Sequence, residues 1–254
     1  EKLIAQYYSG GDFEDLFEST RLVCLLKLAS MTFYGFGGDR DFDFTWNTLN
    51  SIKNNKLLHI NHRSLVQSII AEMYEGGWGC ERNEKTARHI YSKVAANTYI
   101  PIEDRLMPMT KLAAMQCDGR GGSINLEAAR NYYEILVDYE NKLHREIFIP
   151  ILFKLGQMYY FGEGGTTDYI SARICFQRIQ TMGHDDRQDM SEEEWINRIH
   201  SKYFLANMYY EGLGGDKNLM EALNLYTFLK ERDLIRGRVR TIINARFEEL
   251  NQQE

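Results

Sequence analysis

Residues 205–215 read LANMYYEGLGG, and related copies of this stretch recur four times earlier in the chain. Each copy has a methionine followed, four and six residues later, by two glycines. The methionines are 42, 42, 43 and 50 residues apart, at Met31, Met73, Met115, Met158 and Met208. The paired glycines are Gly35 and Gly37, Gly77 and Gly79, Gly119 and Gly121, Gly162 and Gly164, and Gly212 and Gly214. A period of this length indicates stacked supersecondary units rather than one globular core.

The residues before each glycine pair are typical of an amphipathic helix. In the fourth copy, Leu155, Gly156, Met158 and Tyr159 would form one apolar stripe. The small residue in this stripe lets a neighbouring helix approach closely, because a larger side chain would overfill the contact. The first glycine of each pair stands where a helix ends in a left-handed conformation that glycine adopts without steric cost. We call this predicted helix "helix A".

A second helix is predicted after each glycine pair, and we call it "helix B". Six residues beyond the first glycine stands a residue whose side chain can cap a helix N-terminus. These capping residues are Asp41, Asn83, Asn125, Asp168 and Asn218. A small residue and an apolar one then follow four residues apart, on one helix face. These pairs are Thr45/Leu49, Ala87/Tyr91, Ala129/Tyr133, Ala172/Phe176 and Ala222/Tyr226.

The full pattern, from the apolar–small pair through Tyr-x-x-Gly-x-Gly to the cap and the alanine, resembles the Sel-1-like repeat (SLR) family, a relative of tetratricopeptide repeats. The resemblance covers residues 21–233, most of the chain. It implies an all-α fold, a right-handed α-solenoid of five helix-turn-helix repeats. Two departures are visible: the steps are longer than usual for the family, and the first copy has Thr32 and Thr45 in place of the tyrosine and the alanine.

The flanking segments are expected to cover the ends of one solenoid. Residues 1–20 read as an N-terminal cap or degenerate repeat, and residues 234–254 as a C-terminal capping helix. The apolar residues expected to cover the stack are Ile235, Val239, Ile242, Ile243 and Phe247. The longest step places a polar insertion at residues 183–189, and Ser191 after it would cap the last helix A. Pro101, Pro108 and Pro150 are each expected near a helix start.

Composition excludes several classes of function. The net charge is −6 and no basic run occurs, which argues against nucleic-acid binding. No segment approaches the length of an apolar membrane span. The four cysteines occupy non-equivalent repeat positions, which favours free thiols over a disulfide framework. Free thiols in turn favour a cytoplasmic location. Because the sequence begins at Glu1 rather than at methionine, a leader could have been removed.

No catalytic, metal or cofactor template is complete in this sequence. The glycine-rich turns lack the Gly-Lys-Ser/Thr of a phosphate loop. The run Asp39-x-Asp41-x-Asp43 opens like a calcium loop but lacks its glycine and final glutamate. The pair His59/His62 has no third ligand, and residues 184–186 read as part of a polar loop. We therefore expect no cofactor, no metal and no enzymatic activity.

By resemblance to tetratricopeptide geometry, helix A of each repeat would line a concave, partner-binding face. Its aromatic residues would supply binding hot spots, and about half of them are expected to pack between helices instead. Its carboxylates would favour a basic partner. The candidate residues are Phe33, Tyr34, Glu72, Glu75, Asp118, Phe153, Gln157, Tyr160, Phe161, Tyr203, Asn207, Tyr210 and Glu211, with the fourth and fifth repeats richest in aromatics.

The function expected from this resemblance is a non-catalytic scaffold or adaptor that binds a protein or peptide. One alternative is an immunity protein that neutralises a secreted bacterial toxin, because some members of the family have that role. Hydrolase activity, which is attributed to some secreted members of the family, is the less favoured alternative. Fold alone does not decide among them. The oligomeric state and the identity of the partner stay open.

Overall fold

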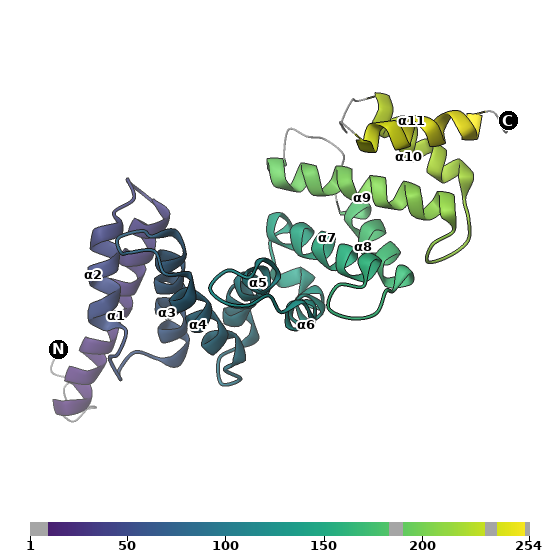
Figure 1. The fold of residues 1–254 in the computed structure, drawn as a ribbon. Helices are drawn as coiled ribbons and strands as arrows, with labels where there is room; N and C mark the ends of the chain where they lie inside the picture. Colours follow the sequence, from purple (N-terminus) through teal and green to yellow (C-terminus); the bar gives the residue numbers. More distant parts are fainter. Residues whose placement is uncertain (1–9, 183–189, 232–237, 252–254) are drawn as a thin grey trace. The chain divides into compact units, whose positions relative to one another are not determined.

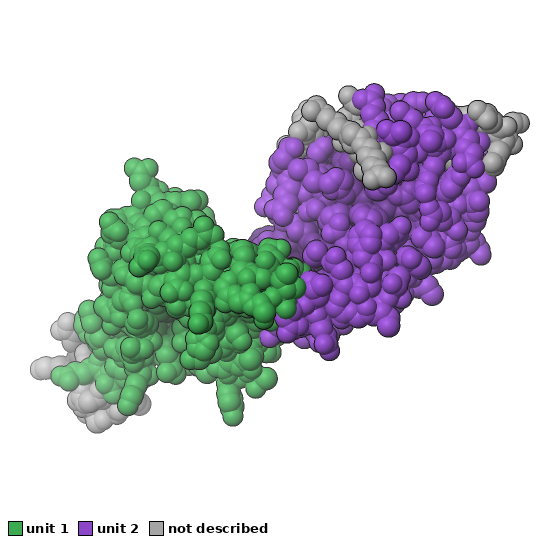
Figure 2. All heavy atoms as spheres, viewed as in Figure 1, with its two compact units in different colours: residues 1–124 green, residues 125–254 purple. Residues whose placement is uncertain are grey.

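The computed structural model describes residues 10–182, 190–231 and 238–251, and every regular element within them is helical (Figure 1). The chain divides into two compact units, residues 1–124 and 125–254 (Figure 2). Each unit is a series of helices in which neighbours along the chain pack together. The prediction of an all-α fold of helical repeats is confirmed.

The described residues of unit 1, from residue 10 onward, form five helices. They are α1 (Gly10–Tyr34), α2 (Phe42–Ile52), α3 (Ile60–Gly76), α4 (Glu84–Ala96) and α5 (Ile102–Asp118). Helices α1 and α3 are the helix A elements of the first two repeats, and each packs on its own helix B. Helix α2 also packs on α3, and α4 on α5, so each helix B contacts the helix A that follows it. The core of the first two repeats includes Leu22, Leu26, Leu49 and Ile69.

The described parts of unit 2 form six α-helices and one 3₁₀ turn. They are α6 (Leu126–Val137), η1 (Glu140–Lys142), α7 (Arg145–Phe161), α8 (Tyr169–Thr181), α9 (Glu192–Glu211), α10 (Leu219–Glu231) and α11 (Arg238–Asn251). The same order of packing recurs, since α6 contacts α7, α8 contacts α9, and α10 contacts α11. The core of the last repeat includes Trp195, Ile199, Tyr226 and Ile243.

Seven residues separate helix A from helix B in every repeat: 35–41, 77–83, 119–125, 162–168 and 212–218. The ten glycines that the sequence places in these turns all have positive φ. In the last turn, Gly212 ends α9 with φ +76°, and its N–H donates to the Met208 carbonyl. The five predicted capping residues all accept a hydrogen bond from the backbone N–H three residues on. Ser191 caps α9 in the same way, as expected.

The second glycine of each later turn lies against the preceding repeat. A Cβ built on Gly79 would lie 2.4 Å from the carbonyl oxygen of Phe42, the first residue of α2. No real side chain tolerates such a contact with backbone, so glycine is required here for the close approach of consecutive repeats. The other three later turns have equivalent distances: 2.3 Å from Gly121 to the Glu84 oxygen, 2.3 Å from Gly164 to the Leu126 oxygen, and 2.2 Å from Gly214 to the Tyr169 oxygen.

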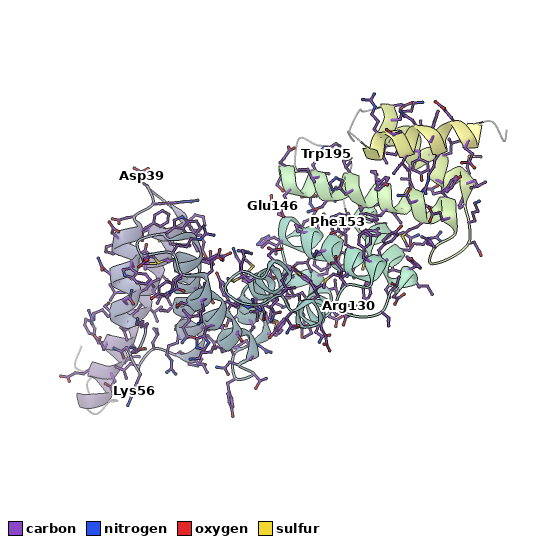
Figure 3. All side chains as sticks on the ribbon, in the orientation of Figure 1. Asp39, Lys56, Arg130, Glu146, Phe153 and Trp195 are labelled. Atoms are coloured by element: carbon purple, nitrogen blue, oxygen red, sulfur yellow. The ribbon has the colours of Figure 1, made fainter. Side chains whose placement is uncertain are left out.

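An arginine in helix B joins each middle repeat to the next turn. It directly follows the buried alanine of helix B, as in Ala129-Arg130 of α6 (Figure 3). Arg130 Nη1 donates to the Thr166 carbonyl at 3.0 Å, and its guanidinium lies over the Tyr159 ring. Arg88 and Arg173 make the equivalent bonds to the turns that follow α5 and α9. In the first repeat Trp46 stands at this position and packs on Tyr74.

The expected end segments meet the structure in part. Helix α1 runs through residue 20, so the boundary drawn between cap and first repeat falls inside one helix. In α11, Ile243 is buried and Phe247 half-buried against the α9–α10 core, whereas Ile242 is exposed. Residue 235, the side chain of Val239 and the polar insertion at 183–189 lie outside the described residues.

The prolines correct one detail of the prediction. Pro101 precedes α5 as its N-cap residue, but Pro108 and Pro150 lie inside α5 and α7, at or near the end of the second turn. Proline has no N–H to donate to the carbonyl four residues earlier. Those carbonyls belong to Asp104 and Glu146, which are exposed, so water can replace the missing donor (Glu146 is labelled in Figure 3).

Candidate protein-binding surface

The structure divides the candidate residues into buried and accessible sets. Phe33, Phe153 and Asn207 are buried, so their side chains belong to the packing of the helices and offer little surface to a partner. The exposed residues are Tyr34, Asp118, Phe161 and Glu211. The half-buried residues are Glu72, Glu75, Gln157, Tyr160, Tyr203 and Tyr210.

In unit 1, two cationic side chains and a phenol contact the carboxylate of Glu75 in α3. Its carboxylate accepts hydrogen bonds from Tyr91 Oη at 3.1 Å and from Arg120 Nη1 at 2.6 Å. Lys111 Nζ lies 3.8 Å from the same carboxylate. Asp118 reaches the same arginine, with its Oδ2 3.4 Å from Arg120 Nε. Glu75 therefore takes part in contacts between successive repeats, and Asp118 pairs with the same arginine within its own repeat.

Glu72, one turn earlier on α3, has a different environment. Tyr34 Oη lies 3.5 Å from its carboxylate, a long hydrogen bond. Burial raises the pKa of the Glu72 carboxyl, Lys111 opposes this rise, and Glu75 adds to it. Burial, followed by the charge of Glu72, raises the pKa of the Tyr34 phenol to about 12. A cation brought by a partner would stabilise the ionised form of Glu72.

In unit 2, the candidate aromatics join others in one group, which we call the aromatic cluster. It draws side chains from three helices, α7, α8 and α9, and Phe153 of α7 is labelled in Figure 3. Ring contacts between 4.9 and 6.2 Å link all members. The cluster consists of Phe153, Tyr160, Phe161, Tyr169, Phe176, Tyr203 and Phe204.

Phe204 is the centre of the aromatic cluster, and the sequence analysis did not single it out. It stacks on Phe176 at 4.9 Å with an interplanar angle of 8°, and it also contacts Tyr160 and Phe161. Phe176 fits beneath it because residue 156 is glycine: a Cβ there would lie 2.7 Å from the Phe176 ring. One signal was available, since the other copies have Lys27, Ile69, Lys111 and Lys154 at this position.

The outer part of the aromatic cluster is open to solvent. Phe161 is 57% exposed and Tyr169 38% exposed, although both rings contact Tyr160, at 5.0 and 5.5 Å. These contacts hold the exposed rings in edge-to-face arrangements on fixed helices. Lys154 and Glu163 form an ion pair of 3.4 Å between α7 and the turn that follows it. The positions of the exposed rings are therefore fixed by contacts within the chain.

Helix α11 covers the candidate residues at the end of α9. Arg246 donates hydrogen bonds to Asn207, to Glu211 and, at 3.1 Å, to Tyr226 Oη. Glu249 accepts a hydrogen bond of 2.6 Å from Tyr210. Asn207, Tyr210 and Glu211 are thus already engaged within the chain. The sequence predicted an apolar capping helix here, but the residues of that segment alone did not indicate these polar contacts.

No other constellation in the described parts of the chain suggests chemistry. Within residues 10–182, 190–231 and 238–251, no three histidine, cysteine, aspartate or glutamate side chains are grouped so as to hold a metal ion. The histidine and aspartates at 184–186 lie outside those ranges. None of the four cysteines, all within those ranges, forms a disulfide bond. None of the described helices combines the length and the apolar character that crossing a membrane requires.

Comparisons with known proteins place this geometry in a family. The Sel1 repeat model matches residues 23–44, 66–99, 109–136, 152–184 and 199–229. Among solved structures, a Sel1 repeat protein from Oxalobacter formigenes is similar, with a TM-score of 0.56, 15% identity, and coverage of 81% of this chain and 71% of that one. The search of curated proteins found no match.

A second similar structure is c5321, described as a protective antigen present in uropathogenic Escherichia coli strains and displaying an SLR fold. Its TM-score is 0.52 at 15% identity, over 95% of this chain. The present chain spans 56% of the length of that protein. At this level of identity, both structures are evidence for the fold alone.

Proposed function

The chain belongs to the Sel1 repeat family, whose members are generally scaffolds for protein–protein interactions, and on this premise we propose that it is a non-catalytic scaffold. Its partner is a protein segment that docks on the aromatic cluster of unit 2. The observation that carries this proposal is the exposed, preorganised pair Phe161 and Tyr169. Singly exposed apolar residues are common on protein surfaces, but a linked group of exposed rings is typical of a binding site.

The chemistry of the partner follows from the surroundings of the cluster. The exposed rings favour a segment that inserts an apolar or aromatic side chain between them. The chain has a net charge of −6, and Glu163, which is paired with Lys154, borders the cluster beside Phe161. Complementary charge therefore favours a partner segment that also carries basic residues. Tyr210 and Glu211 lie outside the surface we assign, because Glu249 and Arg246 of α11 already bind them.

The test uses the full chain as bait in a lysate of the source organism. We compare the unmodified chain with the double variant Tyr160→Ala/Phe161→Ala and with Ile174→Ala. Ile174 is an exposed residue of α8 that takes no part in the ring contacts, so it is a matched control. A true partner is captured by the unmodified chain and the control and depleted on the double variant. With that partner purified, we expect the double variant to bind at least about ten-fold more weakly.

Two results would contradict this proposal. One is that the double variant captures the same proteins as the unmodified chain. The other is that the purified partner binds the double variant with unchanged affinity. A parallel variant, Tyr160→Ala/Tyr210→Ala, shows whether the end of α9 contributes. If α11 shields Tyr210, the loss of affinity should equal that of Tyr160→Ala alone.

A further inference from the structure

Helix α1 has one apolar face in the core and a second apolar face in solvent. Its core face includes Leu22, Leu26, Ala29 and Phe33, which pack on α2 and α3. On the opposite side, Phe17, Cys24, Leu28 and Met31 follow one another at spacings of seven, four and three residues, and all are exposed. These spacings place the four side chains along one stripe of the helix.

Two of these exposed residues, Leu28 and Met31, occupy positions that are buried in every other repeat. Met31 is 46% exposed, whereas the corresponding methionines of the four later copies, Met73, Met115, Met158 and Met208, are each 0% exposed. Leu28 is also 46% exposed, and its counterparts are all buried. In the later copies, helix A packs against helix B of the preceding repeat. Among the described residues, no helix occupies that place beside α1.

The turn after α1 also differs from the later turns, because no preceding repeat packs against its glycines among the described residues. The Cβ of a residue at position 37 would meet only the end of the Met31 side chain, at 3.9 Å, whereas the later second glycines lie against backbone. Gly38 has nothing described within 4 Å, but its counterparts Gly122, Gly165 and Gly215 each lie beneath an arginine of the preceding helix B. The chain thus keeps at its first repeat the features that elsewhere receive a neighbouring helix. We call these features the α1 edge: Leu28, Met31, Gly37, Gly38 and the Asp39 carbonyl.

The later repeats show which helix such an edge binds. In unit 1, Arg88 of α4 donates to the carbonyls of Arg120 and Ser123, at 3.2 and 2.8 Å, in the turn after α5. By position in the turn, Ser123 corresponds to Asp39, which lies at the outer end of its turn (Figure 3). The carboxylates of Asp39 and Asp41 are exposed there. They would add charge complementarity for an incoming guanidinium.

We propose that the α1 edge binds an amphipathic α-helix of a partner protein, with a small residue followed by an arginine, as α4 binds α5. The apolar face of that helix would cover Leu28 and Met31, its first turn would approach Gly37, and its arginine would reach the Asp39 carbonyl. This surface lies in unit 1 and is separate from the aromatic cluster. A second copy of the chain fits less well, because α10 has Leu223 at the arginine position and already packs on α11.

The test uses a peptide with the sequence of residues 83–97, which contains Ala87 and Arg88. The peptide carries His89→Glu, and a lactam bridge between the Lys85 amine and the new carboxyl group keeps it helical; both positions are exposed in α4. The labelled peptide is titrated with the full chain, and NMR shifts of the ¹⁵N-labelled chain locate the contact. We expect binding, with shifts in α1 and residues 35–39. Leu28→Glu/Met31→Glu in the chain, or Arg88→Ala in the peptide, should weaken it about ten-fold or more.

The controls separate this proposal from the binding on the aromatic cluster. Chains with Phe161→Ala or Ile174→Glu should bind the peptide as the unmodified chain does. Circular dichroism should show that Leu28→Glu/Met31→Glu leaves the helical fold intact, because both residues are exposed. The proposal is overturned if the peptide does not bind, or if the charged variant binds it equally well. It is also overturned if the unmodified chain self-associates in sedimentation and Leu28→Glu/Met31→Glu abolishes this, since a second copy would then occupy the edge.

Discussion

Helices α1 and α11 are the first and last that the structure describes. The repeat surface next to α11 is covered, whereas that of α1 is uncovered. Helix α11 lies where a sixth helix A would pack on α10, buries Ile243 there, and binds polar groups through Arg246. Helix α1 leaves Leu28 and Met31 in solvent. A repeat cannot bury its apolar surface alone, so each such surface needs a neighbour or a cap. The difference shows that the first repeat retains a surface that no described helix covers. On our proposal this surface binds a partner, and four predictions examine the difference.

The largest effect should come from placing a charge at the repeated methionine. Met73→Glu would bury a carboxylate without a partner in the core of unit 1, at a cost of about 4 kcal/mol or more. Met31→Glu, at the same repeat position, should change stability by less than about 0.5 kcal/mol, because water already reaches that side chain. Urea unfolding followed by circular dichroism measures both. Equal destabilisation would mean that something covers the α1 edge in solution.

Alanine at the second turn glycine should distinguish the same two repeats. Gly79→Ala must force Phe42 away from its present position and also hold alanine at φ +68°, so we expect a loss of about 3 kcal/mol or more. Gly37→Ala has open space and faces only the strain of φ +86°, about 1–2 kcal/mol. Thermal unfolding of the two variants provides the comparison. A similar loss in both would show that conformation alone, without close approach, selects glycine.

The covered end should be weakened by removing one arginine. Arg246→Ala would leave the buried Asn207 and Tyr226 without one of their partners, which should cost about 2 kcal/mol. Glu248→Ala, at an exposed position of the same helix, should have almost no effect. Hydrogen exchange of α11 and α10 amides measures this locally. Unchanged protection after Arg246→Ala would show that the apolar contacts of Ile243 and Phe247 suffice for the cap.

The smallest effect concerns Glu72, at the repeat position that Asn207 occupies in α9. Because burial raises the pKa of Glu72 in the folded chain, its stabilising contribution is complete below the unfolded pKa, about 4.3. That contribution is lost as pH rises through the folded pKa. Glu72→Gln should therefore be more stable than the unmodified chain at pH 7 and equal to it near pH 3.5. Denaturation at both pH values measures the difference in unfolding free energy between the variant and the unmodified chain. A difference that grows toward acidic pH would contradict the prediction.

The elements that depend on local chemistry were predictable from the sequence. The αL glycine at 212 and the side-chain caps at Asn83 and Ser191 follow from the backbone conformations that glycine and capping residues favour. Because the period repeated five times, each local pattern supported the others. Together they predicted the helix pairs and the positions of the turns.

The surface was less predictable, because it depends on which helices meet. Phe33, Phe153 and Asn207 lie on the predicted face of helix A, but neighbouring helices bury them. Periodicity gives the direction of a side chain and not the depth at which the next helix packs over it. Phe204 and Arg246 were missed for the same reason. Phe204 gains its role from contacts with Phe176 and Phe153, which lie 28 and 51 residues earlier in the chain. Arg246 gains its role from Asn207, 39 residues earlier.

The close approach at the second turn glycine also determines where this chain can change in length. Every turn between helix A and helix B has seven residues, whereas the connections between repeats vary, from residues 97–101 to residues 182–191. An insertion at 77–83 would move Gly79 away from Phe42, but one beside the exposed Lys56, before the buried Leu58, would not. We therefore expect that a fluorescent reporter or an epitope tag placed beside Lys56 leaves the stacking of the repeats unchanged.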